Sequence, residues 1–210
     1  MSQIKAKKLR LTFQQGNLLE ILKDTIQLVE LQAKKKKVNL EMQVDSQLSE
    51  PFWTDHVRLS QIVLNLLNNA INFTQEGVIK LTASPMENNR WVKIAVEDSG
   101  IGMIRENVKR LFSSYTHIDS KGREQINPAG VGLGLNIAYN LAELLGPAGH
   151  NEIKVTSIPN QGSTFSFIVE NKEIKETTAL VPQAQIEESL LLIGDEQNTK
   201  IKGELSLYQK

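Results

Sequence analysis

The sequence predicts an α+β domain in which about three helices form a layer over a mixed β-sheet. Three observations predict this class. The length of 210 residues, with 40% hydrophobic residues, suits one full domain plus a tail. Helical and strand-like hydrophobic periods interleave along the chain. Several predicted strands are joined by short turns, which favours antiparallel pairs over a doubly wound parallel sheet.

The composition excludes several classes of function. The chain has 24 Lys and Arg residues and 24 Asp and Glu residues, so no net field would attract nucleic acid or an anionic membrane. It has no cysteine, which excludes disulfides, thiolate catalysis and Cys-ligated metals. No run approaches the roughly 20 apolar residues of a membrane span, and the N-terminus lacks the apolar stretch of a signal peptide. We therefore expect a cytoplasmic fragment without nucleic-acid or membrane contacts, although a full-length protein could be membrane-anchored.

The first part of the chain predicts a lead-in, a helix and a strand. In residues 1–16, three apolar residues alternate with polar ones like a short edge strand, and Gln14–Gly16 then breaks the pattern. Residues 17–33 carry apolar side chains at near-helical spacing. Residues 38–44 alternate apolar and polar side chains, as a strand does.

The middle of the chain predicts a capped helix followed by a hairpin. Thr54 and Asp55 offer side-chain caps for a helix that runs to about Phe73. The strands 78–84 and 91–97 flank a turn-rich segment, and we expect them to pair as a hairpin.

Later elements complete the predicted domain, and a tail follows. In order, they are a glycine loop at 98–103, a short helix near 104–112, a polar stretch without periodicity at 113–130, a helix at 133–145 that Gly146-Pro147 stops, and strands near 153–157 and 163–170. Residues 171–210 have a linker-like composition, and we expect weak order there. The predicted domain therefore covers residues 17–170.

The helix that ends near Phe73 carries an unusual polar face. At about 100° per residue, its apolar side chains cover an arc of roughly 200°. The remaining arc carries Arg58, Gln61, Asn65, Asn68, Asn69 and Asn72. An Asn side chain offers a neutral oxygen that can complete the shell of Mg²⁺ without repelling a triphosphate. The helix alone leaves a second interpretation open, in which the amides cap turns or hydrogen-bond one another in a core.

The segment Asp98–Gly102 places an acid at the end of a predicted strand, with two glycines after it. A carboxylate there can accept a hydrogen bond from the exocyclic amine of adenine, and the glycines let the backbone approach the base. Guanine has a carbonyl at that position. Because a hydrogen bond to a charged group contributes about 1.5 to 3 kcal/mol, we predict a preference for adenine of about ten- to a hundredfold. Alone, this pattern is also that of an ordinary turn.

The segment Gly130–Leu135 opens the last predicted helix with three glycines. Unblocked backbone N–H groups and the positive end of a helix suit phosphates. The preceding segment, Arg123–Pro128, does not read as a strand, which excludes a dinucleotide-binding fingerprint, and the chain contains no P-loop motif.

Four segments in this order resemble the motifs of sensor histidine kinases. Asn65–Thr74 resembles their N box, Asp98–Gly102 their first glycine box, Gly130–Leu135 their second, and Gln161–Phe165 their closing Gly-Thr segment. The resemblance covers about residues 9–170. It implies the Bergerat ATP-binding fold, a helical layer on a mixed sheet, with residues 103–130 as a flexible lid over the nucleotide.

By motif position, the resemblance implies roles for individual residues. Asn69 would ligate Mg²⁺ and Asn65 would contact phosphate or metal, so these two are the candidate catalytic residues. Asp98 would read adenine, Leu133 would line the pocket, and Thr164 would lie near Asp98. The full implied ATP-binding set is Asn65, Asn69, Asn72, Asp98, Gly100, Gly102, Ile104, Tyr115, Lys121, Arg123, Gly130, Gly132, Leu133, Gly134, Leu135 and Thr164.

Two departures from the family's pattern concern the phosphates and the lid. Family members usually have Lys three residues after the metal-binding Asn, where this chain has Asn72. We predict that Lys121 or Arg123 of the lid supplies this charge, so that neutralising each should weaken ATP binding. The lid also reads Phe112-Ser-Ser-Tyr115 where Phe-x-Pro-Phe is common.

Asn65 separates this chain from the ATP-hydrolysing relatives that its motifs resemble. The chaperone, gyrase and mismatch-repair types place Glu four residues before the metal-binding Asn, and that Glu activates or orients the nucleophile. Asn65 cannot take a proton at neutral pH. Transfer of the γ-phosphoryl of Mg²⁺–ATP to a histidine, in two-component signalling, is therefore the chemistry that the resemblance implies.

The phosphoacceptor is expected outside this chain. His56, His117 and His150 all lack the helical context of a phosphoacceptor, so the dimerisation and phosphoacceptor domain should precede residue 1. A response-regulator receiver domain is the expected next partner. Residues 189–196 resemble the first strand and acidic cluster of a receiver, but the chain ends too soon after them for one to fold. The tail is thus either a linker or a receiver remnant.

Two other functions stay open on the sequence alone. A nucleotide-binding pseudokinase would bind ATP without transferring phosphate, and Asn72 is its best support. A non-enzymatic, anti-sigma-like interaction domain is disfavoured by Asn65 and by the length of the lid.

Overall fold

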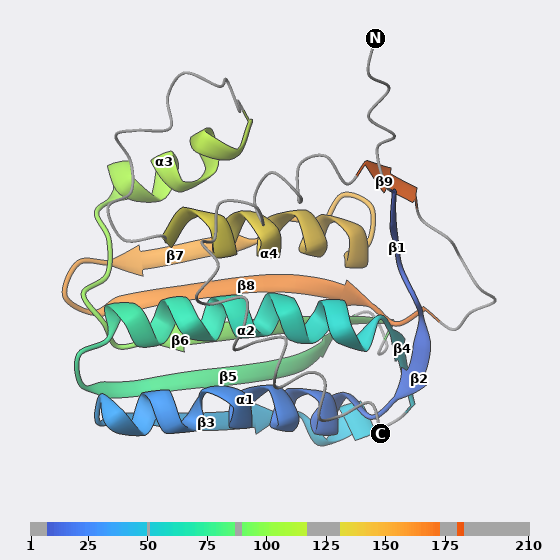
Figure 1. Ribbon diagram of the computed structural model, residues 1–210, viewed down its shortest axis with the longest axis horizontal. Coiled ribbons are helices and arrows are strands. Elements are labelled where there is room, and N and C mark those ends of the chain that lie inside the picture. The colour runs from blue at the N-terminus through green and yellow to red at the C-terminus, as the bar shows by residue number, and fades with distance from the viewer. Residues whose placement is uncertain (1–7, 50, 87–89, 117–130, 173–179, 183–210) are drawn as a thin grey trace, which may run out of the picture. The chain divides into compact units, whose positions relative to one another are not determined.

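The structure is a computed structural model that describes residues 8–49, 51–86, 90–116, 131–172 and 180–182 (Figure 1). The chain divides into two compact units, which we describe separately. One contains residues 1–11 and 178–210, and the other contains residues 12–177.

In the smaller unit, β1 (Lys8–Arg10) pairs antiparallel with β9 (Leu180–Pro182). The sequence does not predict β9. Its partner lies at the other end of the chain, and a pairing of this kind leaves no local pattern.

The larger unit contains a five-stranded mixed sheet. Its strands, in spatial order, are β3 (Val38–Val44), β5 (Gly77–Met86), β6 (Trp91–Asp98), β8 (Gly162–Glu170) and β7 (Lys154–Ile158). β3 and β5 are parallel, and the other pairs are antiparallel. The predicted hairpin is therefore confirmed as β5 and β6, with Ala83 opposite Ile94.

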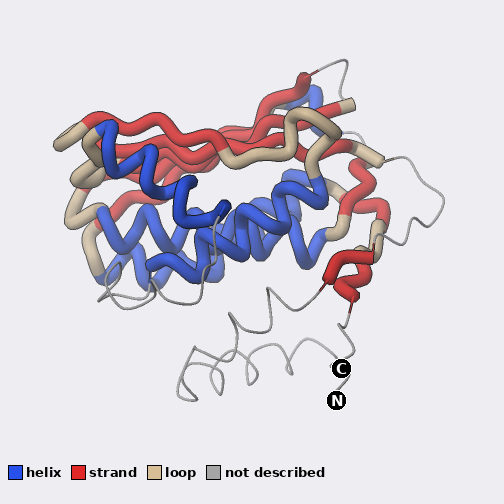
Figure 2. The backbone as a smooth tube through the Cα atoms, turned by 90° about the horizontal axis from the view of Figure 1, so that it is seen from above, coloured by secondary structure: helices blue, strands red, loops and turns tan. Residues whose placement is uncertain are grey.

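Helices lie over one face of this sheet. They are α1 (Leu18–Lys35), α2 (His56–Phe73), α3 (Arg105–Thr116) and α4 (Val131–Leu145). Figure 2 shows helices and strands as separate layers. The predicted fold class, helices over a mixed sheet, is confirmed.

The core forms where alternating strand residues meet α2. Along β5 and β6, the side chains of Ile79, Leu81, Val92, Ile94 and Val96 are buried. On α2, the side chains of Leu59, Ile62, Leu66, Leu67 and Ile71 are fully buried. Because each such side chain contributes about 1.5 to 3 kcal/mol on burial, α2 is held firmly in the core.

The N-terminal end of α2 is fixed by its cap and by a small second sheet. The side chain of Asp55 accepts hydrogen bonds from the backbone N–H of Arg58, as predicted for a cap, and from that of Thr12. β2 (Gln14–Gly16) pairs antiparallel with β4 (Phe52–Thr54). The prediction that Gln14–Gly16 interrupts a strand is therefore wrong, since pairing with a distant segment makes these polar residues a strand.

The C-terminal end of α2 has a partner for each of its last carbonyls. The Lys36 ammonium donates to the carbonyls of Ile71 at 2.9 Å and Asn72 at 3.3 Å. The backbone N–H of Thr74 donates to Ala70, and that of Ile101 donates to Phe73. Helix ends leave four carbonyls without intrahelical partners, so these bonds fix the end of α2 that carries the amides.

α1 runs from Leu18 to Lys35 and not over 17–33, and two further helices differ from their predicted bounds. α3 continues to Thr116, so the first residues of the predicted irregular stretch 113–130 are helical. Propensity is a weak guide here, because Ser, Tyr and Thr are less favourable than Ala by only tenths of a kcal/mol. α4 begins at Val131, which brings Gly132 and Gly134 into its first turn. Within the described residues, no helix is long and apolar enough to cross a membrane.

Candidate functional site

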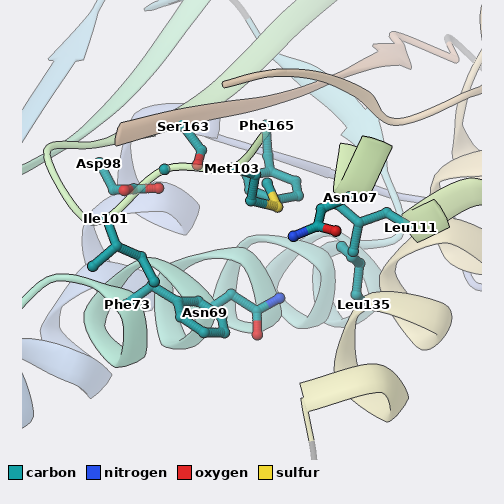
Figure 3. Close-up of a pocket in the computed structure, with 11 residues that line it drawn as sticks. Asn69, Phe73, Asp98, Ile101, Met103, Asn107, Leu111, Leu135, Ser163 and Phe165 are labelled. Carbon is teal, nitrogen blue, oxygen red and sulfur yellow. The ribbon is translucent and has the colours of Figure 1, made fainter. Parts of the chain in front are cut away.

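A cavity of about 260 Å³ lies between the helices and the end of the sheet. It is lined by Asn69 and Phe73 of α2, by Asp98, Ile101, Gly102 and Met103 of the glycine loop, by Asn107 and Leu111 of α3, by Leu135 of α4, and by Ser163 and Phe165 of β8 (Figure 3). The structure thus brings the amide helix and the acidic glycine loop to one cavity, as the sequence predicts.

Asp98, the last residue of β6, is only 6% exposed. Its Oδ1 accepts a hydrogen bond from the backbone N–H of Gly100 at 2.9 Å. Burial raises the pKa of Asp98, the backbone N–H groups of Gly100 and Ser163 oppose this rise, and the charge of Glu97 adds to it. A carboxylate held in this way at a cavity is a strong acceptor for a donor on a ligand.

The glycines after Asp98 are required by close backbone packing. A Cβ on Gly100 would lie 2.4 Å from the carbonyl oxygen of Phe73. Gly102 has φ +60°, and a Cβ there would lie 2.0 Å from the carbonyl oxygen of Ile158. Side chains at either position would displace the loop, so Gly100 keeps the acid close to α2 and Gly102 keeps the loop close to the end of β7.

The amide face of α2 is only partly inside the cavity. Asn69 is buried and lines it, and Asn72 is exposed and does not. Asn65 is half-buried beneath the first turn of α4, where a Cβ on Gly134 would lie 3.1 Å from its Oδ1. Gly134 therefore lets α4 approach the amide row closely. Closer to the start of α2, Arg58 donates to the side chain of Gln61.

The cavity has polar ends and an apolar middle. Figure 3 shows Asp98 and Ser163 at one side and Asn69 and Asn107 toward the other, with Phe165 among the side chains between them. A flat heteroaromatic ring with an amino group suits the apolar middle and the acid, and an anionic group with its cation suits neutral amides. This distribution fits a purine nucleotide.

Ser163 and Thr164, at the start of β8, differ in their relation to the cavity. Ser163 lines the cavity and Thr164 does not, because side chains alternate between the faces of β8. Thr164 instead lies opposite Glu97 and Thr156. In the register of β8, Ser163 and not Thr164 stands directly opposite Asp98, and a contact of Thr164 with the nucleotide stays a prediction.

The remaining predicted residues are distributed as follows. Leu135 lines the cavity, and Ile104 is 50% exposed and is not among the lining residues. Gly132 and Leu133 belong to the first turn of α4, and Tyr115 belongs to the end of α3. Lys121, Arg123 and Gly130 lie outside the described residues, so their predicted phosphate contacts stay predictions.

Several lining residues were not predicted. Phe73, Ile101, Met103, Leu111 and Phe165 are apolar, and in a sequence such residues are indistinguishable from core residues. Asn107 carries no recognisable motif. For Ser163, the signal was the Gly-Ser-Thr segment that begins β8.

The described histidines lie away from the cavity. His56 Nε2 lies 3.1 Å from the carbonyl oxygen of Gln14, and the His150 ring packs against Trp91. His117 is outside the described residues. Among the residues that the structure describes, no group of three His, Cys, Asp or Glu side chains could hold a metal.

The comparisons with known proteins give the family. Residues 54–173 match the family described as histidine kinase-, DNA gyrase B- and HSP90-like ATPases. The chain belongs to this family. Its resemblance to the catalytic domains of sensor histidine kinases is confirmed by the following relatives.

The chain is 34% identical to sensor protein GacS of Pseudomonas syringae pv. syringae over 196 residues, which is 90% of this chain and 21% of that protein. It is 31% identical to the aerobic respiration control sensor protein ArcB of Escherichia coli K12, covering 84% of this chain and 22% of ArcB. The chain thus spans about a fifth of the length of these curated relatives.

Solved structures agree with this assignment. Full-length ShkA in complex with AMPPNP matches with a TM-score of 0.62 and 27% identity, covering 83% of this chain and 33% of ShkA. The catalytic domain of histidine kinase ThkA matches with a TM-score of 0.61 and 26% identity, covering 77% of this chain and 99% of that domain. The Bergerat-type ATP-binding fold expected from the sequence is confirmed.

Proposed function

We propose that this domain binds Mg²⁺–ATP and transfers its γ-phosphoryl to a histidine of a separate dimerisation and phosphoacceptor domain. The observation that carries the proposal is the convergence of Asp98 and Asn69 on one cavity. Residues 17–170 would form the catalytic unit, residues 1–16 would lead in from the phosphoacceptor domain, and residues 171–210 would be a linker or receiver remnant.

The adenine would lie in the apolar middle of the cavity. Asp98 would accept the hydrogen bond of its exocyclic amine, held by the N–H groups of Gly100 and Ser163. Phe73 and Phe165 supply apolar surface around the ring. Guanine would place a carbonyl against the carboxylate, so these residues select ATP over GTP.

The phosphates would extend toward the amide face of α2 and the first turn of α4. Asn69 is buried and lines the cavity, so its oxygen fits a magnesium ligand that adds no negative charge. Mg²⁺, when bound, would neutralise charge on the phosphate oxygens. Asn65 and the N–H groups that open α4 would contact the phosphates.

The transfer needs no general base in this chain. An imidazole nitrogen of the acceptor would attack the γ-phosphorus, the bond to the β,γ-bridging oxygen would break, and ADP would leave with that electron pair. The imidazole proton would go to a group of the acceptor domain. Asn65 activates no water, which favours transfer over hydrolysis.

The wider assignment is also a proposal. A response-regulator receiver would take the phosphoryl group next, and similar proteins include hybrid signal transduction histidine kinase B of Dictyostelium discoideum. We place the domain in the cytoplasm because its phosphoryl donor is ATP. The structure does not support the pseudokinase alternative. Asn72 is the best support for that alternative in the sequence, but it is exposed and does not line the cavity.

A transfer assay with a donated phosphoacceptor domain tests the proposal. With ATP labelled at the γ-phosphate, we expect acid-labile, alkali-stable label on the donated domain. Asn69→Ala should abolish it, and Asn39→Ala, at an exposed position of β3, should not. Binding of ATP without any transfer would support the pseudokinase. Absence of binding by calorimetry would remove the proposal altogether.

A further inference from the structure

The turn between β7 and β8 is in direct backbone contact with the glycine loop, residues 98–103. A Cβ on Gly162 would lie 1.8 Å from the carbonyl oxygen of Asp98, and Gly162 has φ +111°. The backbone N–H of Asn160 donates to the carbonyl of Ile101 at 2.7 Å. At Gly162 the two loops therefore meet backbone to backbone, with no room for a side chain at that position.

The Ser157 hydroxyl also connects these two loops by hydrogen bonds. Ser157 Oγ, in β7, accepts a hydrogen bond from the backbone N–H of Met103 at 2.7 Å. It donates to the carbonyl of Gly162 at 3.0 Å and lies 3.0 Å from Ser163 Oγ. A hydroxyl has one proton and two lone pairs, so one donated and two accepted bonds use all of its capacity.

The partners of Ser157 are parts of the cavity, although Ser157 is not among its lining residues. Met103 and Ser163 both line it. Met103 also lies two residues before Arg105, where α3 begins. The position of Met103 therefore affects the position of α3 and of Asn107, which lines the cavity. Ser163 lies on the other side, directly opposite Asp98 in the register of β6 and β8, where its backbone N–H lowers the pKa of the Asp98 carboxyl.

We infer that Ser157 is a positioning residue for nucleotide binding, which sets the distance between Met103 and Ser163 and aims the Ser163 N–H at Asp98. The inference rests on the proposed function, because the ligand whose base it positions is ATP. Ser157 acts through its neighbours.

This role predicts an effect on selectivity as well as on affinity. Without the hydroxyl, the Met103 N–H loses its partner, and the strand end that carries Ser163 loses two bonds to β7. Asp98 would then be less firmly held, so the preference for ATP over GTP should fall. A purely structural role would lower the folded fraction and would scale both affinities equally.

The test measures the dissociation constants of a non-hydrolysable ATP analogue by calorimetry and of GTP by competition. For Ser157→Ala, we expect the constant for the ATP analogue to rise by about tenfold, as for a lost buried hydrogen bond. The ATP/GTP affinity ratio should fall by about threefold or more on the same grounds. Ser157→Thr, which keeps the hydroxyl, should restore both values.

A neighbouring residue supplies the matched control. Thr156 is exposed on the opposite face of β7, so Thr156→Ala should bind both nucleotides like the unsubstituted chain. If Ser157→Ala does not fold by circular dichroism, Ser157→Cys replaces it, because a thiol is a similar shape with a weak donor and acceptor. The positioning role then requires that Ser157→Cys lower the ATP/GTP affinity ratio.

The outcomes separate the two levels of the proposal. No binding by the unsubstituted chain would overturn the proposed function. With normal binding by that chain, an unchanged affinity in the Ser157 variant would overturn the positioning role. A weaker affinity with an unchanged ATP/GTP ratio would also overturn it and would assign Ser157 to stability alone.

Discussion

Two buried aspartates stand at opposite ends of α2. Asp55 caps the N-terminal end and is 4% exposed, and Asp98 lies beside the C-terminal end and is 6% exposed. Both accept backbone hydrogen bonds. In Asp55 the two carboxylate oxygens receive the N–H groups of Arg58 and Thr12, at 3.0 and 2.8 Å.

The difference between them is the space in front of the carboxylate. Asp98 lines the cavity, and Asp55 does not. Asp55 has no cavity in front of it, so its hydrogen bonds contribute only to the stability of the fold. An acid that faces a cavity, with its pKa raised by burial, is placed for a ligand instead. Burial and residue type alone therefore do not identify a site.

Among substitutions that distinguish the roles of Asp55 and Asp98, Asp98→Asn should have the largest effect, on the affinity for ATP. Loss of a hydrogen bond to a charged acceptor should weaken ATP binding by about ten- to a hundredfold, or about 1.5 to 3 kcal/mol. The free energy of unfolding without ligand should not fall, because a neutral amide removes the penalty of burying a charge. Calorimetry and urea unfolding measure the two quantities. A variant that lost stability but kept its affinity would reverse the assignment of roles.

The converse substitution is Asp55→Ala. Loss of the cap should lower the free energy of unfolding by about 1 to 2 kcal/mol. The affinity for ATP should not change under conditions where the variant is folded. Asp45→Ala is the matched control, because Asp45 makes one similar bond, to the N–H of Gln47, on the exposed surface. A tenfold loss of ATP affinity in Asp55→Ala would show that the two acids are not functionally separate.

Protonation of Asp98 should change stability and ATP binding in opposite directions, which is the third prediction. In the folded chain the pKa of Asp98 is raised above its unfolded value, which is near 3.8. As the pH falls, the folded state therefore takes up the Asp98 proton before the unfolded state does. As pH falls through this window, the contribution of Asp98 makes unfolding less favourable. ATP binding should weaken over the same range, by up to about tenfold per pH unit, because the charged acceptor is lost.

Asp98→Asn is the reference for this experiment. The nucleotide's own ionisations affect both proteins equally, so the difference between their affinity profiles reports Asp98. We expect that difference to disappear as the acid becomes protonated. Parallel profiles at all pH values would show that the carboxylate does not contact the base.

The sequence predicts those parts of the fold whose signals are local. The bounds of α2 agree with the Asp55 cap and the apolar period, and β3 agrees with a seven-residue alternation. The pairing of β2 with β4 was not predictable, because Gln14–Gly16 becomes a strand only through a partner distant in the sequence.

The same distinction holds for the site. Asn69 and Asp98 carry unusual chemistry for their positions, so their residue types indicate a polar ligand. The apolar lining residues could not be separated from the core, and Ser163 could not be separated from Thr164 without the register of β8. Ser157 gives no signal in the sequence, since its role lies entirely in three contacts across two loops.

The smallest expected effect concerns a charge at the same end of α2 that has no part in the cavity. Lys36 donates to the carbonyls of Ile71 and Asn72, where a cation interacts favourably with the helix end. Lys36→Met should lower the free energy of unfolding by about 0.3 to 1 kcal/mol, and less at high salt. Lys35→Met, at the adjacent exposed position, is the control. ATP affinity should be unchanged in both, because what distinguishes Asp98 is the cavity before it and not its place at the end of the helix. A Lys36 variant that bound ATP several-fold more weakly would mean that this helix end acts on the nucleotide as a whole.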